Sequence, residues 1–262
     1  MNERRSSLKE RLSGNRAYEE LPISKPADYY QIYEATFGPW RTGDVRLLEM
    51  GVAEGDSVRV WLDWFPNGQI AGLDLNEPPQ LGDLGDRLHL YRGSQDDTAL
   101  LDRIAREVAP EGFDIIIDDA SHIGWLSAAS FWHLFPNHLK SGGIYVIEDW
   151  MTGYWPGWRT DGRRFRGKMP PSADSVASLA ARPFRQLDTR RRWVNRLRYR
   201  LGVNWPLSNI RSHQGGMVGV VKQIVDAIAV DSIRFGNPDA VVGDSSVAWL
   251  EIRSGQVIVH KN

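Results

Sequence analysis

Two apolar segments of the sequence each end in a pair of carboxylates. Residues 113–119 read FDIIIDD, and residues 143–147 run directly into a second acidic pair. Runs of branched apolar residues are typical of strands that are buried on both faces of a parallel sheet. Ligands of such sheets bind at the carboxyl ends of the strands, so we expect these acids and a nearby histidine at one edge. The side chains expected there are Asp118, Asp119, His122, Glu148 and Asp149.

Three of these acids could hold a metal ion. Asp119, Glu148 and Asp149 offer hard carboxylate oxygens, and no cysteine or histidine cluster accompanies them, which favours Mg²⁺ or Ca²⁺ over zinc. Two neighbouring hydroxyls of a sugar could fill open positions on such an ion, and a metal-bound hydroxyl is more acidic. The alternative interpretation is structural, because paired acids at strand ends also cap helices and form salt bridges.

His122 is the candidate general base. An imidazole is the side chain best suited to accept a proton near neutral pH, and His122 follows Asp119 on the same loop. We therefore place His122 and Asp119 in the catalytic group. A single histidine is also commonly a structural residue, and the sequence leaves that alternative open.

The segment 49–55, EMGVAEG, follows an apolar strand pattern and indicates a cofactor site. Glycines four positions apart let the chain turn tightly and let the next helix point its N-terminus at a ligand. The acid before the first glycine would repel a pyrophosphate, but it suits the ammonium of an amino acid attached to a nucleoside, as in S-adenosylmethionine. An acid about twenty positions later suits ribose hydroxyls. The alternative is a Rossmann-like domain that binds another nucleotide or none. The residues expected to hold S-adenosylmethionine are Glu49, Gly51, Gly55, Asp74, Ser94, Gln95 and, at the methionine end, Asp118.

Composition excludes several classes of function. The 262 residues carry a net charge of −1, so no global field favours nucleic acid or an anionic membrane. No apolar run is long enough to span a bilayer, and the charged N-terminus lacks the apolar core of a signal peptide. With no cysteines there are no disulfides. We expect a cytoplasmic protein with no nucleic-acid or membrane partner.

The order of predicted elements indicates one α/β domain over residues 1–262. Strands alternate with helices, which is the doubly wound, Rossmann-like pattern. Residues 1–40 are expected to form an arm followed by a helix over the cofactor entrance. The predicted strands are 45–50, 69–75, 88–92, 113–119, 143–147, 231–235 and 256–260, and the predicted helices are 25–40, 56–65, 97–108, 124–139 and 216–230.

The segment 151–209 interrupts this alternation. It is rich in proline and tryptophan and has little periodicity, which is typical of a lid, an oligomer contact or a mobile loop. Within it, Arg182–Arg200 carries eight arginines and one aspartate. This run could bind a phosphate or a carboxylated substrate, or it could be a solvated face.

Three motifs resemble one enzyme family. Residues 117–122 (IDDASH), 142–149 (GGIYVIED) and 154–157 (YWPG) are similar to the metal-dependent sugar O-methyltransferases of macrolide biosynthesis, such as the macrocin and mycinamicin enzymes. The resemblance implies a class I methyltransferase fold with seven strands, the last antiparallel, and commonly an oligomer. It also implies that Asp119, Glu148 and Asp149 hold Mg²⁺ and that His122 is the base. Nothing in 159–209 matches the family.

Together these features predict a Mg²⁺-dependent transfer of a methyl group from S-adenosylmethionine to a hydroxyl of a sugar or glycoside. The acceptor could be the deoxysugar of a natural product or a mono- or oligosaccharide. One alternative is a catechol-type O-methyltransferase, in which vicinal phenol hydroxyls bind the same metal. The other is a non-catalytic nucleotide-binding protein with a purely structural acidic edge.

Overall fold

The structure is a computed structural model, and it describes residues 25–76, 85–155, 215–236 and 245–262. The predicted arm at 1–20 lies outside these residues. So do positions 156–209 of the predicted inserted segment, including the run Arg182–Arg200.

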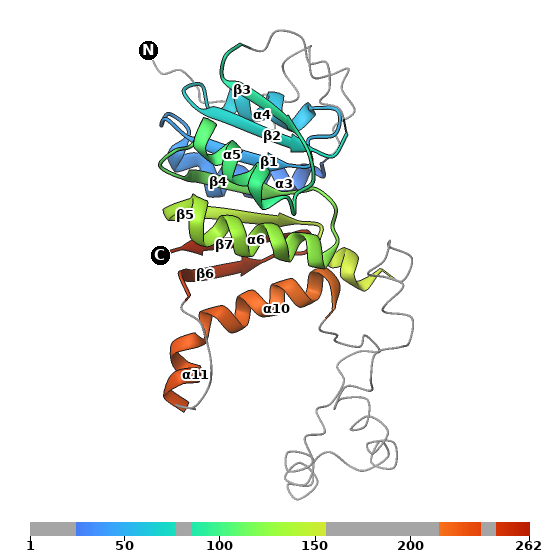
Figure 1. Cartoon of the computed structure of the whole chain (residues 1–262), viewed down its shortest axis with the longest axis vertical. Helices are drawn as coiled ribbons and strands as arrows, with labels where there is room; N and C mark the ends of the chain where they lie inside the picture. Colours follow the sequence, from blue (N-terminus) through green and yellow to red (C-terminus); the bar gives the residue numbers. More distant parts are fainter. Residues whose placement is uncertain (1–24, 77–84, 156–214, 237–244) are drawn as a thin grey trace, which may run out of the picture.

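Within the described residues, seven strands form one sheet in the order β3-β2-β1-β4-β5-β7-β6 (Figure 1). Strands β1 to β5 pair in parallel, and β7 lies antiparallel between β5 and β6. The expected seven-stranded, mostly parallel sheet with an antiparallel last strand is therefore confirmed. The strands are β1 (Arg46–Met50), β2 (Gln69–Asp74), β3 (Leu88–Arg92), β4 (Phe113–Asp118), β5 (Leu139–Glu148), β6 (Val247–Ile252) and β7 (Gln256–Lys261).

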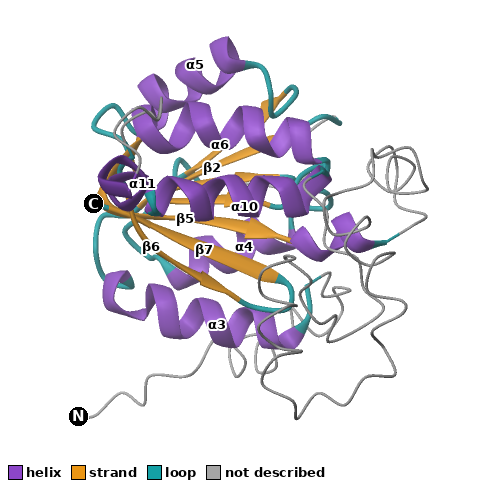
Figure 2. Ribbon diagram, turned by 90° about the horizontal axis from the view of Figure 1, so that it is seen from below, coloured by secondary structure: helices purple, strands orange, loops and turns teal. Residues whose placement is uncertain are grey.

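Helices cover both faces of the sheet (Figure 2). On one face lie α3 (Ala27–Phe37) and α4 (Asp56–Trp64), and on the other lie α5 (Thr98–Val108), α6 (Gly124–His138) and α10 (Gly216–Ile228). Three short helices complete the described chain: η1 (Gly38–Trp40), η2 (Trp150–Tyr154) and α11 (Val230–Gly236). None of the helices in the described ranges combines the length and the apolar character that a bilayer span requires.

The alternation of side chains along each strand divides the core between these two faces. In β4, Ile116 packs with the helices α5, α6 and α10, whereas Ile115 and Ile117 pack with α3 and α4. All three isoleucines are fully buried. A strand covered by helices on both sides needs apolar residues at every position, which explains the continuous run in the sequence. The central strand β4 was therefore predictable from its local run of isoleucines.

The final strands differ from the sequence prediction. The predicted strand at 256–260 is β7, but the predicted strand at 231–235 is wrong, because these residues belong to α11. The partner of β7 is β6, joined to it by a tight turn in which the Arg253 N–H donates to the Gln256 carbonyl at 2.8 Å. A short connection closes at a lower entropy cost than a long turn, so β6 outcompetes the earlier segment.

Candidate active site

The loops at the carboxyl edge of the sheet carry the predicted site residues. Each of the five parallel strands contributes predicted site residues at its end or in the loop that follows it. The contributions are Glu49, Gly51 and Gly55 from β1 and its loop, Asp74 from β2, Ser94 and Gln95 after β3, Asp118, Asp119 and His122 from β4 and its loop, and Glu148 and Asp149 from β5 and its loop.

Backbone strain is concentrated at this edge. Among the described residues, the non-glycine residues with positive φ are Ala53 (46°), His122 (50°) and Asp149 (52°). They lie in the loops after β1, β4 and β5, so each strained residue borders the same edge. Left-handed conformations are costly for residues with a Cβ and persist where the surrounding structure enforces them, which is common at functional sites.

A lysine fills the centre of the acidic group. The buried ammonium of Lys25 lies 2.8 Å from Glu148 Oε1 and 3.3 Å from Glu49 Oε1, and it also donates a hydrogen bond to Asp119 Oδ2. Lys25 lies two residues before the start of α3, and packing of this helix against the sheet places the lysine side chain in the site. Three carboxylates from three strands or their loops therefore converge on one cation.

Two tyrosines of α3 complete the cover of the acids. The Tyr33 hydroxyl donates to Glu148 Oε1, and the Tyr29 hydroxyl donates to Asp149 Oδ1 at 2.7 Å. Residues four apart lie on the same face of a helix, so both hydroxyls reach the end of β5. The predicted helix over this edge of the sheet thus supplies hydrogen-bond donors as well as apolar rings.

Burial controls the charge of this group. Desolvation, together with repulsion from Asp119, raises the pKa of Glu148 to about 8, against the lowering effect of Lys25. Desolvation also raises the pKa of Glu49. The pKa of Lys25 is well above its ordinary value, because attraction to Glu148, Asp119 and Glu49 outweighs desolvation. One ammonium cannot balance the buried Glu49 and Glu148 and the partly exposed Asp119 when all three are ionised, so the site has an excess of acidic groups that a second cation could neutralise.

The more accessible side of the acidic group fits a divalent cation. His122 Nε2 lies 3.6 Å from Asp119 Oδ1 and 3.7 Å from Asp149 Oδ2. One ligand atom from each of these three residues lies within 4.8 Å of the others. Of the predicted metal ligands, the structure therefore brings Asp119 and Asp149 together around His122, whereas the Glu148 carboxylate turns inward to Lys25 and Tyr33.

The glycine turn after β1 contacts the loop after β4. Gly51 has φ 91°, and a Cβ there would lie 2.1 Å from the Asp119 carbonyl oxygen. Gly55, with φ 86°, is the N-cap of α4. Asp74 Oδ2 accepts a hydrogen bond of 2.9 Å from the Ala53 N–H, which ties the end of β2 to this turn. The turn and the acidic loop therefore form one continuous surface.

Two side chains of α4 hold the Glu49 carboxylate. Its Oε2 accepts hydrogen bonds from Ser57 Oγ at 2.7 Å and Trp61 Nε1 at 3.0 Å, and its Oε1 faces Lys25. The side chain is fully buried. The contact with Lys25 pairs this carboxylate with an ammonium of the chain itself.

Asp118 lies on the opposite face of the sheet from Glu49 and Glu148. Gln95 Nε2 donates to Asp118 Oδ1 at 3.0 Å, and Gln95 Oε1 accepts from the Ser121 N–H at 3.1 Å. Burial raises the pKa of Asp118. The structure thus joins Gln95 and Asp118 beneath the loop after β4, while the Ser94 hydroxyl donates to Asp96.

The sequence prediction missed the polar contribution of α3. Tyr29 and Tyr33 are detectable only as part of an aromatic helical pattern, and their hydroxyl partners are more than a hundred positions away. Lys25 precedes Pro26 and belongs to no periodic pattern, so no local signal distinguishes it.

Part of the chain is similar in sequence to known O-methyltransferases. No family model matches the chain. The mycinamicin VI 2''-O-methyltransferase of Micromonospora griseorubida is 43% identical over 154 residues, which cover 56% of this chain and 36% of that protein. The 8-demethyl-8-(2-methoxy-α-L-rhamnosyl)-tetracenomycin-C 3'-O-methyltransferase of Streptomyces olivaceus is 39% identical over 158 residues. These residues cover 55% of this chain and 39% of that protein. The chain thus matches well under half the length of these relatives.

A solved structure extends the similarity to nearly the whole chain. The MycE methyltransferase from the mycinamycin biosynthetic pathway, in complex with Mg, SAH and mycinamycin VI, superposes with a TM-score of 0.62 and 29% identity, covering 98% of this chain and 55% of that one. The resemblance inferred from the three motifs is confirmed: the chain has a class I methyltransferase fold and is similar to the sugar O-methyltransferases that act on macrolides and tetracenomycins.

Proposed function

We propose that this protein transfers a methyl group from S-adenosylmethionine to a hydroxyl of a sugar carried by a natural-product glycoside, with Mg²⁺ as the metal. The observation that carries this proposal is the meeting of Asp119, His122 and Asp149 beside the Glu49 turn. Relatives named as O-methyltransferases of glycosylated macrolides and tetracenomycins support the choice of acceptor. They do not favour the catechol alternative.

The residues at the glycine turn fit S-adenosylmethionine. Glu49 is held by Ser57 and Trp61 with one oxygen facing an ammonium, so the same oxygen suits the ammonium of the cofactor. Asp74 keeps unused lone pairs for ribose hydroxyls, because a carboxylate can accept about four hydrogen bonds. Gly51 lets the turn approach the loop after β4 closely, Gly55 starts α4, and Gln95 with Asp118 supports the floor of the site.

The acids fit Mg²⁺. Asp119 and Asp149 would hold it, and Glu148 could join them if its carboxylate turned away from Lys25. When bound, Mg²⁺ polarises a coordinated hydroxyl and lowers its pKa, while S-adenosylmethionine supplies the methyl group. The chain aligns the donor and acceptor and keeps them close, which is the largest contribution that a protein makes to such a displacement.

His122 would accept the proton of the sugar hydroxyl at Nε2. The carboxylates of Asp119 and Asp149 lie 3.6 and 3.7 Å from this nitrogen, so they would favour the charge that the ring gains. The left-handed backbone of His122 directs the ring into the site at a cost that only the surrounding contacts can offset.

The test is a titration with S-adenosylmethionine by calorimetry, followed by a transfer assay with labelled cofactor. Macrolide glycosides, free sugars and catechols are offered with Mg²⁺ or with a chelator. We expect cofactor binding and chelator-sensitive methylation of a glycoside. Asp149→Asn should abolish transfer but keep cofactor binding, whereas Asp44→Asn, at a side chain that is 68% exposed, should change neither.

Other outcomes separate the alternatives. Methylation of catechols alone would support the catechol-type activity. Binding without any transfer, including for acceptors of the related enzymes, would support a non-catalytic nucleotide-binding protein. Absence of cofactor binding would contradict the whole proposal. A homo-oligomeric assembly and a cytoplasmic location stay predictions.

A further inference from the structure

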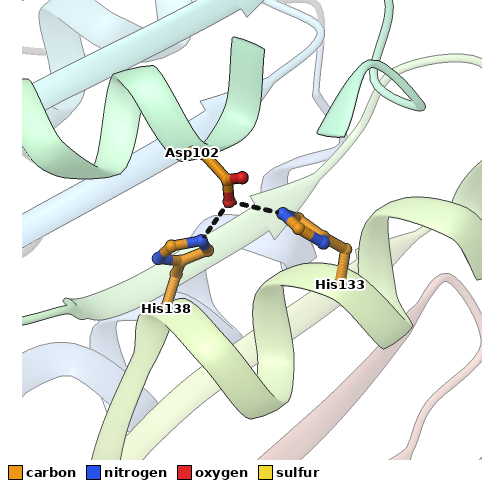
Figure 3. Close-up of side chains that lie close together, drawn as sticks. All are labelled: Asp102, His133 and His138. Carbon is orange, nitrogen blue, oxygen red and sulfur yellow. Dashed lines mark hydrogen bonds and ion pairs between the residues drawn. The ribbon is translucent and has the colours of Figure 1, made fainter. Parts of the chain in front are cut away.

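A second group of metal-ligating side chains lies on the helical layer formed by α5 and α6 (Figure 3). His133 Nε2 lies 2.7 Å from Asp102 Oδ1, and His138 Nε2 lies 2.6 Å from the same oxygen. The two imidazole rings are tilted, with centroids 5.4 Å apart. All three side chains are partly exposed, so solvent ions can reach them.

The hydrophobic core fixes this arrangement. Leu101 and Leu134, each adjacent in sequence to a member of the group, are buried in the same core cluster between the helices and the sheet. Packing of α5 against α6 therefore sets the distance between Asp102 and His133. His138 is the last residue of α6, where the chain leaves the helix for β5, and this position brings its ring to the same carboxylate.

The chemistry of the group is that of a transition-metal site. Two imidazole nitrogens and one carboxylate oxygen are a common ligand set for Zn²⁺ and for Fe²⁺, Co²⁺ or Ni²⁺, whereas Mg²⁺ prefers oxygen alone. One ligand atom from each residue lies within 4.8 Å of the others. Tetrahedral bonds of about 2.1 Å separate ligand atoms by about 3.4 Å, so small rotations of partly exposed side chains would admit an ion.

The group is separate from the candidate active site. Helix α6 begins after the loop of β4, at the carboxyl edge, and runs back to the start of β5 at the opposite edge. His138 therefore lies at the far end of α6 from His122. The residues around the acidic edge belong to β4, β5 and α3, and none of them contacts Asp102 in the contacts described.

We propose that Asp102, His133 and His138 bind one divalent transition-metal ion of the zinc class, which links α5 to α6. The convergence of two Nε2 atoms on one carboxylate oxygen carries the proposal, since an ion that replaces the shared protons would satisfy all three groups at once. With three protein ligands, the remaining coordination position is left for water. The proposal is independent of the methyl-transfer activity.

The experiment is a titration of the metal-free protein with Co²⁺, followed by its visible absorption, in the presence of excess Mg²⁺ to fill the acidic edge. We expect one Co²⁺ per chain at this site and a rise in the thermal unfolding midpoint. His133→Gln and His138→Gln should each weaken the affinity at least about tenfold, since even the loss of an outer-shell partner has that effect. Glutamine can still hydrogen-bond Asp102, so the helices stay joined.

Two controls locate the ion. His89→Gln changes a histidine that lies 2.9 Å from Gln69 on the β3 side of the sheet, and Asp149→Asn changes the acidic edge. Both variants should leave the affinity of the Asp102, His133 and His138 group for Co²⁺ unchanged. The chain has only six histidines, so their imidazole ring resonances can be followed by NMR in the unsubstituted protein. Zn²⁺ should shift the resonances of His133 and His138.

Three results would overturn the proposal. These are unchanged affinity in both glutamine variants, a loss of Co²⁺ only in Asp149→Asn, or no binding of Co²⁺ and no shift of the two ring resonances. In each case the group is a hydrogen-bonded clamp between α5 and α6.

Discussion

Lys25 Nζ lies 2.8 Å from Glu148 Oε1, although 123 positions separate the two residues. The contact joins the residue before α3 to the last residue of β5 and places a fixed positive charge at the acidic edge. The same carboxylate is a predicted metal ligand. Lys25 therefore stabilises the acids when no other cation is bound, and, on the proposed function, it would compete with a metal for Glu148.

Replacing Lys25 by methionine should expose this dual role. Removal of one partner from a buried ionic group leaves uncompensated charge, which costs about 3 to 5 kcal/mol. We expect a loss of about 3 kcal/mol in the free energy of unfolding, since protonation of Glu148 relieves part of the repulsion. Millimolar Mg²⁺ should restore more stability in Lys25→Met than it adds to the unsubstituted protein, measured by urea unfolding.

The matched control is Lys140→Met. Lys140 also pairs with a carboxylate, Asp114, at 2.9 Å, but both side chains are partly exposed. Partly exposed pairs contribute about 0 to 1 kcal/mol, so the loss should be small and insensitive to Mg²⁺. Similar losses in the two lysine variants would show that burial of Lys25 does not matter.

The stability of the metal-free protein should fall as the pH rises toward 8. Desolvation raises the pKa of Glu148 to about 8 in the folded protein, whereas an unfolded glutamate titrates near about 4.3. Between these values the folded state holds a proton that the unfolded chain releases. The stabilising effect of this proton is complete below the unfolded pKa, declines through the window and is lost above the folded pKa.

The slope attributable to Glu148 is about 1.4 kcal/mol per pH unit at most, and urea unfolding at several pH values between about 5 and 8 would measure it. Glu148→Gln cannot release a proton and should flatten the profile. Glu251→Gln, which alters an exposed ion pair with Arg253, should leave the profile unchanged. An identical slope in Glu148→Gln would assign the pH dependence to another group.

Much of the sheet could be predicted from the sequence because its signals are local. The run Ile115–Ile117 has only one stable placement, a strand with helices on both faces, and the acids that follow it are carried to the edge by chain direction alone. The glycines of the turn after β1 are predictable for the same reason, since positive φ is required at Gly51 and Gly55.

The rest depends on tertiary contacts that leave no local pattern. Glu148 and Asp149 are equivalent in the sequence, yet Glu148, the last residue of β5, pairs with Lys25, whereas Asp149, which follows the strand with a φ of 52°, contacts Tyr29 and His122. The helix α11 in place of a strand is another case. Its sequence includes Val230, Ile233 and Phe235, residue types that are common in strands, but β6 occupies the sheet position beside β7.

His122→Asn should separate chemistry from binding. Asparagine tolerates the left-handed backbone of this position but cannot act as a base, so the fold and the cofactor site should persist. On the proposed function, we expect kcat to fall by about 10² to 10⁴, with an unchanged dissociation constant for S-adenosylmethionine by calorimetry. His89→Asn is the control and should keep full turnover. Equal turnover in His122→Asn would remove the base assignment.

Gly51→Ala should disrupt the contact between the glycine turn and the acidic loop. A Cβ at this residue would lie 2.1 Å from the Asp119 carbonyl oxygen and 2.7 Å from Ala120 Cα. Both clashing atoms are backbone, so no side-chain rotation can relieve the overlap. The positive φ adds about 1 to 2 kcal/mol and the overlap about 1 to 3 kcal/mol, so we expect a loss of about 3 kcal/mol in the free energy of unfolding.

Gly142→Ala isolates the backbone part of this cost. Gly142 has φ 75°, and a Cβ there would meet nothing within 4 Å. Its substitution should therefore cost only the conformational term of about 1 to 2 kcal/mol and leave cofactor binding intact. Urea unfolding gives both losses, and calorimetry with S-adenosylmethionine gives the effect on binding. If the two alanine variants lost equal stability, the close approach of Gly51 to Asp119 would not be a constraint on this site, and the turn would tolerate a side chain.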